Sequence, residues 1–390
     1  MNPAERAYGE AVAVLRSCVR PAGFYASGLK GGYEAVWARD SMITSLGGAA
    51  AGREFKRPFG QSLSLLMKHQ STRGQIPNAV GSYNTDRKSD VTFNSIDSTL
   101  WYLVGMRAYG AAYGERAFAR RYKKSVDAAF TWLSYQDPNE DGLPVQQPTM
   151  DWQDAFPHKY GRTINTLALY FAALRMYGKS ALARRVQRVV NGAQEQYLSL
   201  YDKKRGYYLP WIWKNHVSSR EEEYWFDTLG NVLAIVTGLA TPAIAKRILS
   251  YIDKEKINRP YPCKAIFPPI KKGDKEWKNY FADSDARTPY EYLNGGIWPM
   301  VGGFYVAALV KTRQFKKAER ELLRLAEGNK QVNKELAPRS LGARGWGFQE
   351  WLHGKSGKAF GNSNPYQAWS AGAYLFAYEC VRRKRVPFFT

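Results

Sequence analysis

Two acidic residues beside tryptophans are the residues of this sequence best placed to do chemistry. Asp154 lies in residues 150–155 (MDWQDA) and Glu350 in residues 346–351 (WGFQEW), and each segment precedes a stretch with helical periodicity. Hydrolysis of a glycosidic bond requires two carboxyl groups, because one protonates the leaving oxygen and the other activates water or attacks the sugar carbon. Flat aromatic rings suit the apolar faces of sugars. The two segments therefore predict a site that acts on carbohydrate.

The composition supports a large domain rich in aromatic side chains. The chain has 390 residues, of which 45% are hydrophobic and 14% aromatic, enough for a large core. Several of its 12 Trp and 26 Tyr residues lie in segments rich in glycine and proline, which favours a carbohydrate cleft over a core of large side chains alone. Helical toroids exceed the usual domain size as single units, so we predict one domain over residues 1–390.

The charge and the cysteines narrow the class of protein. The net charge of +23 alone suggests a polyanion partner, but the basic residues are spread along expected helices, which favours a solvated surface without a specific nucleic-acid partner. Cys18, Cys263 and Cys380 show neither a disulfide framework nor zinc-ligand spacing. The N-terminal residues do not resemble a signal peptide, and no apolar run reaches the roughly 18 residues of a membrane span. We therefore expect a cytoplasmic protein with no bound metal and no membrane contact.

Helical periodicity dominates the chain, and Thr241-Pro242 marks one helix start. The expected helices cover residues 4–18, 37–51, 56–70, 95–113, 115–135, 161–177, 180–201, 225–239, 242–253, 293–312, 315–328 and 365–384.

Short and long connections alternate between these helices. Six helical hairpins with this alternation, closed into a ring, form an all-α (α/α)6 toroid whose long connections emerge at one end as the active-site face. Long loops in a compact domain are usually functional. Both acidic segments lie on long connections, so ring closure would bring them together.

Six blocks resemble a known family in its own order. They are VWARD (36–40), DSTLWYLVGMRAYG (97–110), DAFPHKYGRTINTLALYFAAL (154–174), WFDTLGNVLAIVTGLATP (225–242), YEYLNGGIWP (290–299), and QEWLHGKSGKAFG (349–361) with YQAWSAGAYL (366–375). As a set they resemble the alkaline/neutral invertases, glycoside hydrolase family 100, and more distantly the amylo-α-1,6-glucosidase domain of glycogen debranching enzymes. The resemblance implies an (α/α)6 fold and a cofactor-free, inverting hydrolase of an α-glucosidic bond.

The resemblance also assigns roles to residues. Asp154 matches the general acid and Glu350 the second catalytic carboxylate, and Asp151 is the alternative acid. Arg39 is better interpreted as an ion-pair partner than as a catalyst. The matching blocks supply the expected substrate-binding set: Arg39, Asp40, Asp97, Asp151, Trp152, Asn294, Gly295, Gly296, Trp298 and Gln367.

These roles carry physical expectations. An inverting pair lies roughly 6.5–9.5 Å apart to admit a water molecule. Burial beside Trp152 and other carboxylates would raise the pKa of Asp154, while Glu350 stays ionised. Asp40 and Asp97 lie near expected helix starts, where capping the helix is the alternative role. The glycines of residues 294–296 would either let backbone approach a ligand or form a tight turn.

The sequence departs from the family at two places. Leu293 stands where the family has a histidine, and a long acidic insertion is largely missing.

The best expectation for the substrate, a small saccharide, is sucrose, and other α-glucosides, including α-1,6-linked ones, are the alternative. A helical protein that binds carbohydrate or a polyanion without catalysis is the competing class, and the resemblance allows a homo-oligomer.

Overall fold

The computed structural model describes residues 2–31, 33–81, 89–193, 198–216, 219–283, 288–337 and 345–389. These residues are mostly helical, as the periodicity predicts, with short strands in the connections. In the part of the chain so described, no helix is long and apolar enough to cross a lipid bilayer.

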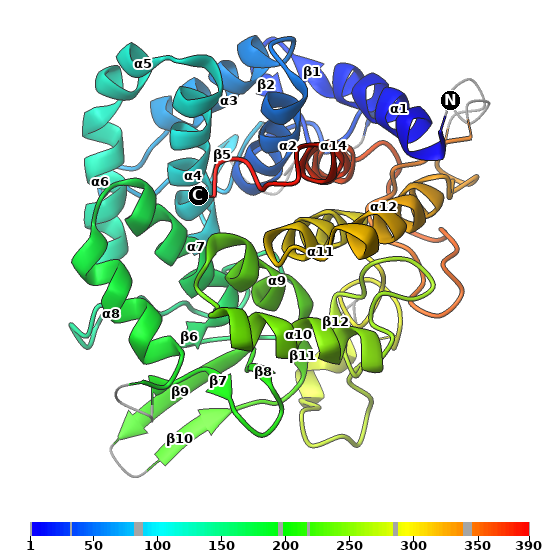
Figure 1. Cartoon of the computed structure of the whole chain (residues 1–390). Coiled ribbons are helices and arrows are strands. Elements are labelled where there is room, and N and C mark those ends of the chain that lie inside the picture. The colour runs from blue at the N-terminus through cyan, green and yellow to red at the C-terminus, as the bar shows by residue number, and fades with distance from the viewer. Residues whose placement is uncertain are drawn as a thin grey trace.

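Six helices pack side by side in a closed series. Each contacts the next along the chain, and the last one, α14, packs against both its predecessor and the first (Figure 1). Nearly all of their residues are buried, and a helix that is apolar all round must lie inside a protein. They are α2 (Ala38–Ala51), α4 (Ile96–Tyr113), α7 (Ile164–Met176), α9 (Thr228–Thr237), α11 (Pro299–Lys311) and α14 (Ala368–Arg383).

The remaining long helices cover this inner series from outside. All but the short α5 are amphipathic: in α8, for example, Ala183, Val186 and Val190 are buried while Arg184 and Arg188 are exposed. They are α1 (Pro3–Cys18) on α14, α3 (Lys56–Lys68) on α2 and α4, α5 (Arg116–Arg121) and α6 (Lys123–Ser134) on α4, α8 (Ser180–Val190) on α7, α10 (Pro242–Lys254) on α9, and α12 (Phe315–Asn329) on α11.

Helix starts follow local capping chemistry. The side chains of Thr163, Asp227 and Thr241 accept backbone N–H bonds at the starts of α7, α9 and α10. The start predicted at Thr241-Pro242 is confirmed. Three expectations were wrong. The helix expected over 180–201 ends at Val190, with residues 194–197 outside the described part of the chain, and the one expected over 293–312 begins only at Pro299. The single helix expected over 115–135 is two helices, α5 and α6.

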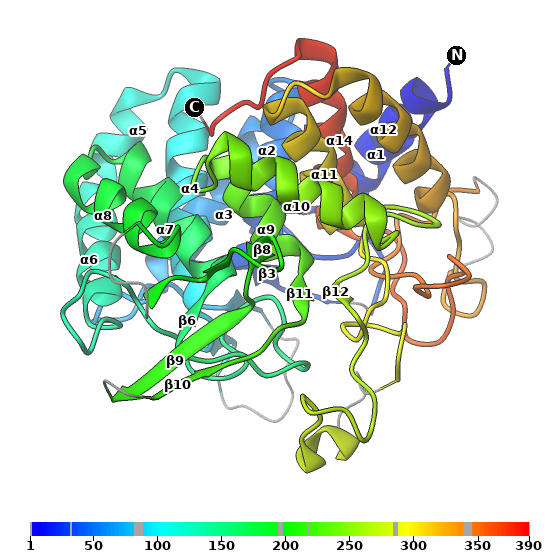
Figure 2. The same cartoon turned by 60° about the horizontal axis from the view of Figure 1, so that its bottom comes forward.

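Short antiparallel strands tie the long connections together at one end of the inner helices (Figure 2). Three of them, β3, β6 and β11, lead directly into α2, α7 and α9, so strand pairing sets where those helices begin. The pairs are β1 (Val19–Arg20) with β2 (Gly23–Phe24); β3 (Val36–Trp37) with β4 (Ala79–Val80), and β4 with β5 (Val91–Thr92); β6 (Arg162–Thr163) with β9 (Trp211–His216), and β9 with β10 (Ser219–Glu222); β7 (Tyr201–Asp202) with β8 (Tyr207–Tyr208); and β11 (Phe226–Asp227) with β12 (Ile266–Phe267).

The closing contact of the series depends on glycine. A Cβ atom on Gly47 of α2 would overlap the carbonyl oxygen of Gly372 in α14, and one on Gly303 of α11 would lie 2.6 Å from the carbonyl oxygen of Ala373. The backbones of these helices therefore approach more closely than any side chain would allow.

We expect Gly47→Ala to lower the free energy of unfolding by about 1–3 kcal/mol, because α2 and α14 must move apart to admit the methyl group. This loss outweighs the roughly 0.5–1 kcal/mol that alanine gains over glycine inside a helix. Urea denaturation of the purified variant measures it.

Gly9→Ala is the matched control. Gly9 is exposed in α1, and a Cβ atom there would meet nothing within 4 Å. This variant should be as stable as the parent or slightly more so, and equal effects at the two positions would contradict the close-packing argument.

Candidate active site

A pocket with aromatic walls lies among the long connections. Asp154 and Glu350, far apart in the sequence, both line it. Its other charged side chains, Arg39 and Asp40, come from the first turn of α2. Its rings are Tyr33, Trp37, Trp152, Tyr292, Trp298 and Trp369.

Trp298 is the centre of the aromatic wall. Its ring packs edge-on against Trp152 and Trp369, with ring centroids 5.5 Å and 5.7 Å away, and lies 5.2 Å from the ring of Tyr292. Its indole Nε1 donates a hydrogen bond to the carbonyl oxygen of Tyr292 at 3.0 Å. Two long connections and the start of α14 thus contribute rings to one cluster.

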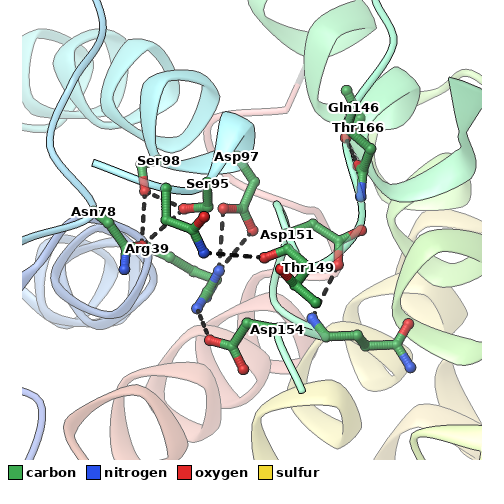
Figure 3. A network of polar contacts seen from close by, with 12 residues as sticks. Arg39, Asn78, Ser95, Asp97, Ser98, Gln146, Thr149, Asp151, Asp154 and Thr166 are labelled. Carbon is green, nitrogen blue, oxygen red and sulfur yellow. Dashed lines mark hydrogen bonds and ion pairs between the residues drawn. The ribbon is translucent and has the colours of Figure 1, made fainter. Parts of the chain in front are cut away.

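Arg39 joins the pocket to a buried carboxylate behind it. Its Nη1 donates to both carboxylate oxygens of Asp97, at 3.1 Å and 3.0 Å, and its Nη2 lies 3.6 Å from Oδ2 of Asp154 (Figure 3). The interpretation of Arg39 as an ion-pair partner therefore agrees with its geometry. Asp97 is fully buried and does not line the pocket, so it can act on substrate only through Arg39.

Neither Asp40 nor Asp97 caps its helix, contrary to the alternative considered for them. Both lie in the first turn, and the residues in the capping positions are Trp37 for α2 and Ser95 for α4. A carboxylate in a first turn still benefits from the positive end of the helix dipole. Burial nevertheless raises the pKa of Asp40 to about 6, with the charge of Asp154 adding to the rise and that of Arg39 opposing it.

Asp154 sits at the mouth of the pocket, with 38% of its side chain exposed. Partial removal from water raises its pKa to about 6, and the neighbouring charges of Asp97 and Asp151 act in the same direction, while Arg39 opposes the rise. The direction matches the expectation for a general acid. A sugar covering this side chain would displace the remaining water and raise the pKa further.

Glu350 lies deeper, with 5% of the residue exposed. The hydroxyl of Tyr33 donates to its Oε1 at 3.2 Å, and no Lys, Arg or His of the described chain lies within ion-pair distance of it. Burial raises the pKa of Glu350 to about 8, helped by the charges of Asp40 and Asp154. This raised pKa opposes the expectation that Glu350 is ionised at neutral pH, because Arg39 compensates Asp154 and no cation of the described chain compensates Glu350.

Asp151, the alternative acid, lies outside the pocket. It is fully buried and its carboxylate pairs with Nζ of Lys159 at 2.7 Å. Lys159 also pairs with Asp227, the capping residue of α9, at 2.9 Å. Lys159 thus joins the connection that carries Asp154 to the start of α9 and holds Asp151 beside it.

Residues 294–296 form a tight turn and do not line the pocket. The Asn294 side chain bonds the backbone N–H and C=O of Ile270, both at 2.8 Å, and Gly295 has φ +89°, a conformation that glycine adopts readily. A Cβ atom on Gly296 would overlap the carbonyl oxygen of Tyr292. The turn alternative therefore describes these residues, and it positions Tyr292 and Trp298, which do line the pocket.

Gln367 is also placed beside the pocket wall and not among its lining residues. It precedes α14, and its backbone N–H donates to the carbonyl oxygen of Phe348 at 2.9 Å. Its position joins the connection that carries Glu350 to the last inner helix. Direct contact of Gln367 with a sugar stays a prediction.

Sequence reasoning missed several residues of the site. Tyr33, Tyr292 and Trp369 line the pocket, and Lys159 fastens the Asp154 connection. Tyr33 lies just before the block VWARD, and Tyr292 and Trp369 lie inside matched blocks, so proximity to those blocks was the available signal. Nothing in the sequence around Lys159, inside the block 154–174, indicated that this lysine would be buried.

Several known proteins similar to this chain are named as invertases. The family model of alkaline and neutral invertases matches residues 159–383, more than half of the chain. Over 162 residues the chain is 32% identical to cytosolic invertase 1 of Oryza sativa subsp. japonica, covering 41% of this chain and 26% of that protein. Over 331 residues it is 25% identical to probable alkaline/neutral invertase F of Arabidopsis thaliana, covering 72% and 63%. The chain thus spans less than two thirds of the length of these relatives.

Solved structures share the fold over almost the whole chain. An uncharacterized conserved protein from Thermus thermophilus has a TM-score of 0.70 at 15% identity, covering 95% of this chain and 98% of that one. The GH63 mannosylglycerate hydrolase of the same organism, in complex with Tris and D-glycerate, has a TM-score of 0.66 at 16% identity, covering 95% and 99%. At such identity the likeness concerns the fold alone. With the family match over residues 159–383, the resemblance seen in the six blocks is confirmed, and this chain belongs to the alkaline and neutral invertase family of glycoside hydrolases.

Proposed function

We propose that this protein is an inverting glycosidase that hydrolyses an α-glucosidic bond, with sucrose as substrate and glucose and fructose as products. The observation that carries the proposal is the meeting of Asp154 and Glu350 in one pocket walled by tryptophan and tyrosine. Membership of the invertase family supports sucrose in particular. Leu293, where the family has a histidine, is fully buried and does not line the pocket, so this departure does not remove a pocket side chain.

In the proposed reaction Asp154 gives its proton to the glycosidic oxygen as the bond to the anomeric carbon breaks. Glu350 takes a proton from the water that attacks that carbon from the opposite face, so an α-glucoside releases glucose with inverted configuration. The aromatic wall around Trp298 would hold the ring of the sugar. Arg39 would keep Asp154 oriented before the sugar arrives.

The reactive form has the proton on Asp154 and not on Glu350. Before a sugar binds, the pKa of Glu350, about 8, exceeds that of Asp154, about 6, so a single proton favours Glu350. Substrate binding covers the exposed Asp154 side chain and favours its protonated form. The two carboxyl groups therefore act as a coupled pair, in which the substrate helps to place the proton.

We further propose an (α/α)6 toroid over a single domain of residues 1–390, with the six inner helices as its inner layer. The closed series of helix contacts and the outer helices that cover it support this architecture. The name of the rice relative, a cytosolic invertase, supports a cytoplasmic location.

The catalytic roles predict different responses to two substitutions. Asp154→Asn and Glu350→Gln should each lower kcat for sucrose by about 10²–10⁴-fold, because each removes one proton-transfer group. On α-glucosyl fluoride, whose leaving group needs no proton, Asp154→Asn should retain most of the parent rate and Glu350→Gln should not. Initial rates of glucose release on both substrates measure this.

Asp127→Asn, on the exposed surface of α6, is the matched control and should leave both rates unchanged. A Glu350→Gln variant active on the fluoride beside an inactive Asp154→Asn variant would show instead that Glu350 is the acid and Asp154 the base.

Maltose, isomaltose, trehalose and glycogen limit dextrin belong in the same assay. Glucose release from α-1,6-linked substrates in place of sucrose would move the protein to the debranching group, and no release from any sugar would favour binding without catalysis.

The pKa shifts predict a bell-shaped dependence of kcat/KM on pH. Activity should fall below about pH 6, where both carboxyl groups are protonated and no base remains, and above about pH 8, where both are ionised and no acid remains. Asp40→Asn removes a negative charge that raises the pKa of Glu350, so the alkaline limb should move to lower pH. Rates at low substrate concentration from about pH 5 to about pH 9 test this, and an alkaline limb that stays in place would contradict the assignment.

A further inference from the structure

A second hollow lies at the other end of the inner helices. Its volume is about 630 Å³, within the roughly 300–1,000 Å³ of small-molecule sites. The ends of α2, α4, α7 and α14 line it together with the tail after α14. Figure 2 shows the C-terminus at this end, away from the strands β9 and β10. None of its lining residues belongs to the pocket that holds Asp154 and Glu350.

Five guanidinium groups from separate parts of the chain line this hollow: Arg53, Arg107, Arg175, Arg383 and Arg385. The carboxylate of Glu379 accepts a bond from Arg383 at 2.7 Å, but it also pairs with Arg382. Within the described ranges, no carboxylate lies at ion-pair distance from the other four arginines. The hollow is therefore a concentration of positive charge with little compensation.

The positive charge of this hollow also acts on a nearby lysine, Lys311. Nζ of Lys311, in the last turn of α11, donates to the carbonyl oxygen of Phe389 at 2.8 Å. Burial lowers the pKa of Lys311, and the charge of Arg175 lowers it further. Arg175 therefore adds a positive potential at Lys311 to the effect of burial.

Helix ends account for part of this charge but not for all of it. Each of the four helices ends at the hollow with roughly half a negative charge, about −2 together, and Glu379 adds −1 against +5 from the arginines. The remainder is about +2. Arg383 does cap a helix, because its Nη2 donates to the carbonyl oxygen of Ala50 at 2.7 Å. Arg107 and Arg175 instead rest over the rings of Tyr177 and Phe171, contacts that hold a guanidinium in place without neutralising it.

We propose that this hollow binds a phosphate monoester dianion, carried by a metabolite about the size of a hexose phosphate. Guanidinium groups bind phosphate oxygens in pairs of parallel hydrogen bonds, and a dianion offsets the residual charge of the hollow. Pro387 and Phe388, which also line it, provide apolar surface for the organic part. The proposal concerns a separate site and does not depend on the proposed hydrolysis.

Isothermal titration calorimetry with glucose 6-phosphate, inorganic phosphate and glucose tests this at an ionic strength held constant with sodium chloride. The full chain should bind one glucose 6-phosphate at this site. The double variant Arg53→Gln/Arg385→Gln should bind it at least about tenfold more weakly, because two charge-assisted contacts are lost. Glucose binding, which needs no arginine of the hollow, should not change.

The control is Arg57→Gln/Arg184→Gln, two exposed arginines outside the hollow, which lowers the net charge by the same two units. Its affinity should equal that of the parent chain. Arg53 and Arg385 lie outside the helices, and Arg57 and Arg184 are exposed on α3 and α8, so both double variants should fold. Arg107→Gln alone repeats the test if the first pair does not. Equal affinity for inorganic phosphate would support the site with the free ion as its ligand. No binding to the parent chain, or an equal loss in the control pair, would overturn the proposal.

Discussion

The imbalance between acidic and basic side chains at one end of the molecule sets the chemistry of the site. Six carboxylates gather there: Asp40, Asp97, Asp151, Asp154, Asp227 and Glu350. Arg39 pairs with two of them and Lys159 with two others, which leaves Asp40 and Glu350 without a cation at ion-pair distance among the described residues. Buried carboxylates without a counter-charge retain protons. The site therefore holds protons near neutral pH, which a general acid requires.

Closure of the inner helices makes this gathering possible. The acidic residues come from connections and helix starts spread over most of the chain, and they meet because α14 returns to pack on α2 through glycine contacts. Helix direction then gives the two ends opposite character. Asp40 and Asp97 lie in first turns, where helix dipoles favour negative charge, and the arginines of the opposite hollow lie near the last turns, where dipoles favour positive charge.

Much of the fold could be predicted because burial leaves a direct mark on sequence. The inner helices are apolar all round and the outer ones on one face, and this periodicity located nearly every helix. Boundaries were harder where a turn overrides the pattern. Residues 293–298 read as helix from their composition, but Gly295 at positive φ and the bonds between Asn294 and Ile270 place them in a turn that ends at Pro299.

The sequence by itself determined which residue types could act on a sugar, the family, and the helices that carry them. Only the tertiary structure decided which of these residues share a pocket. Asp154 and Glu350 both line it, whereas Asp97, Asp151 and Asn294 lie outside it and hold neighbouring residues in place. It also decided the order of the pKa values, since that order depends on Arg39 lying beside Asp154 and on the lack of a cation at ion-pair distance from Glu350 among the described residues. Such pairings join residues distant in the chain, and local sequence carries no record of the distance between them.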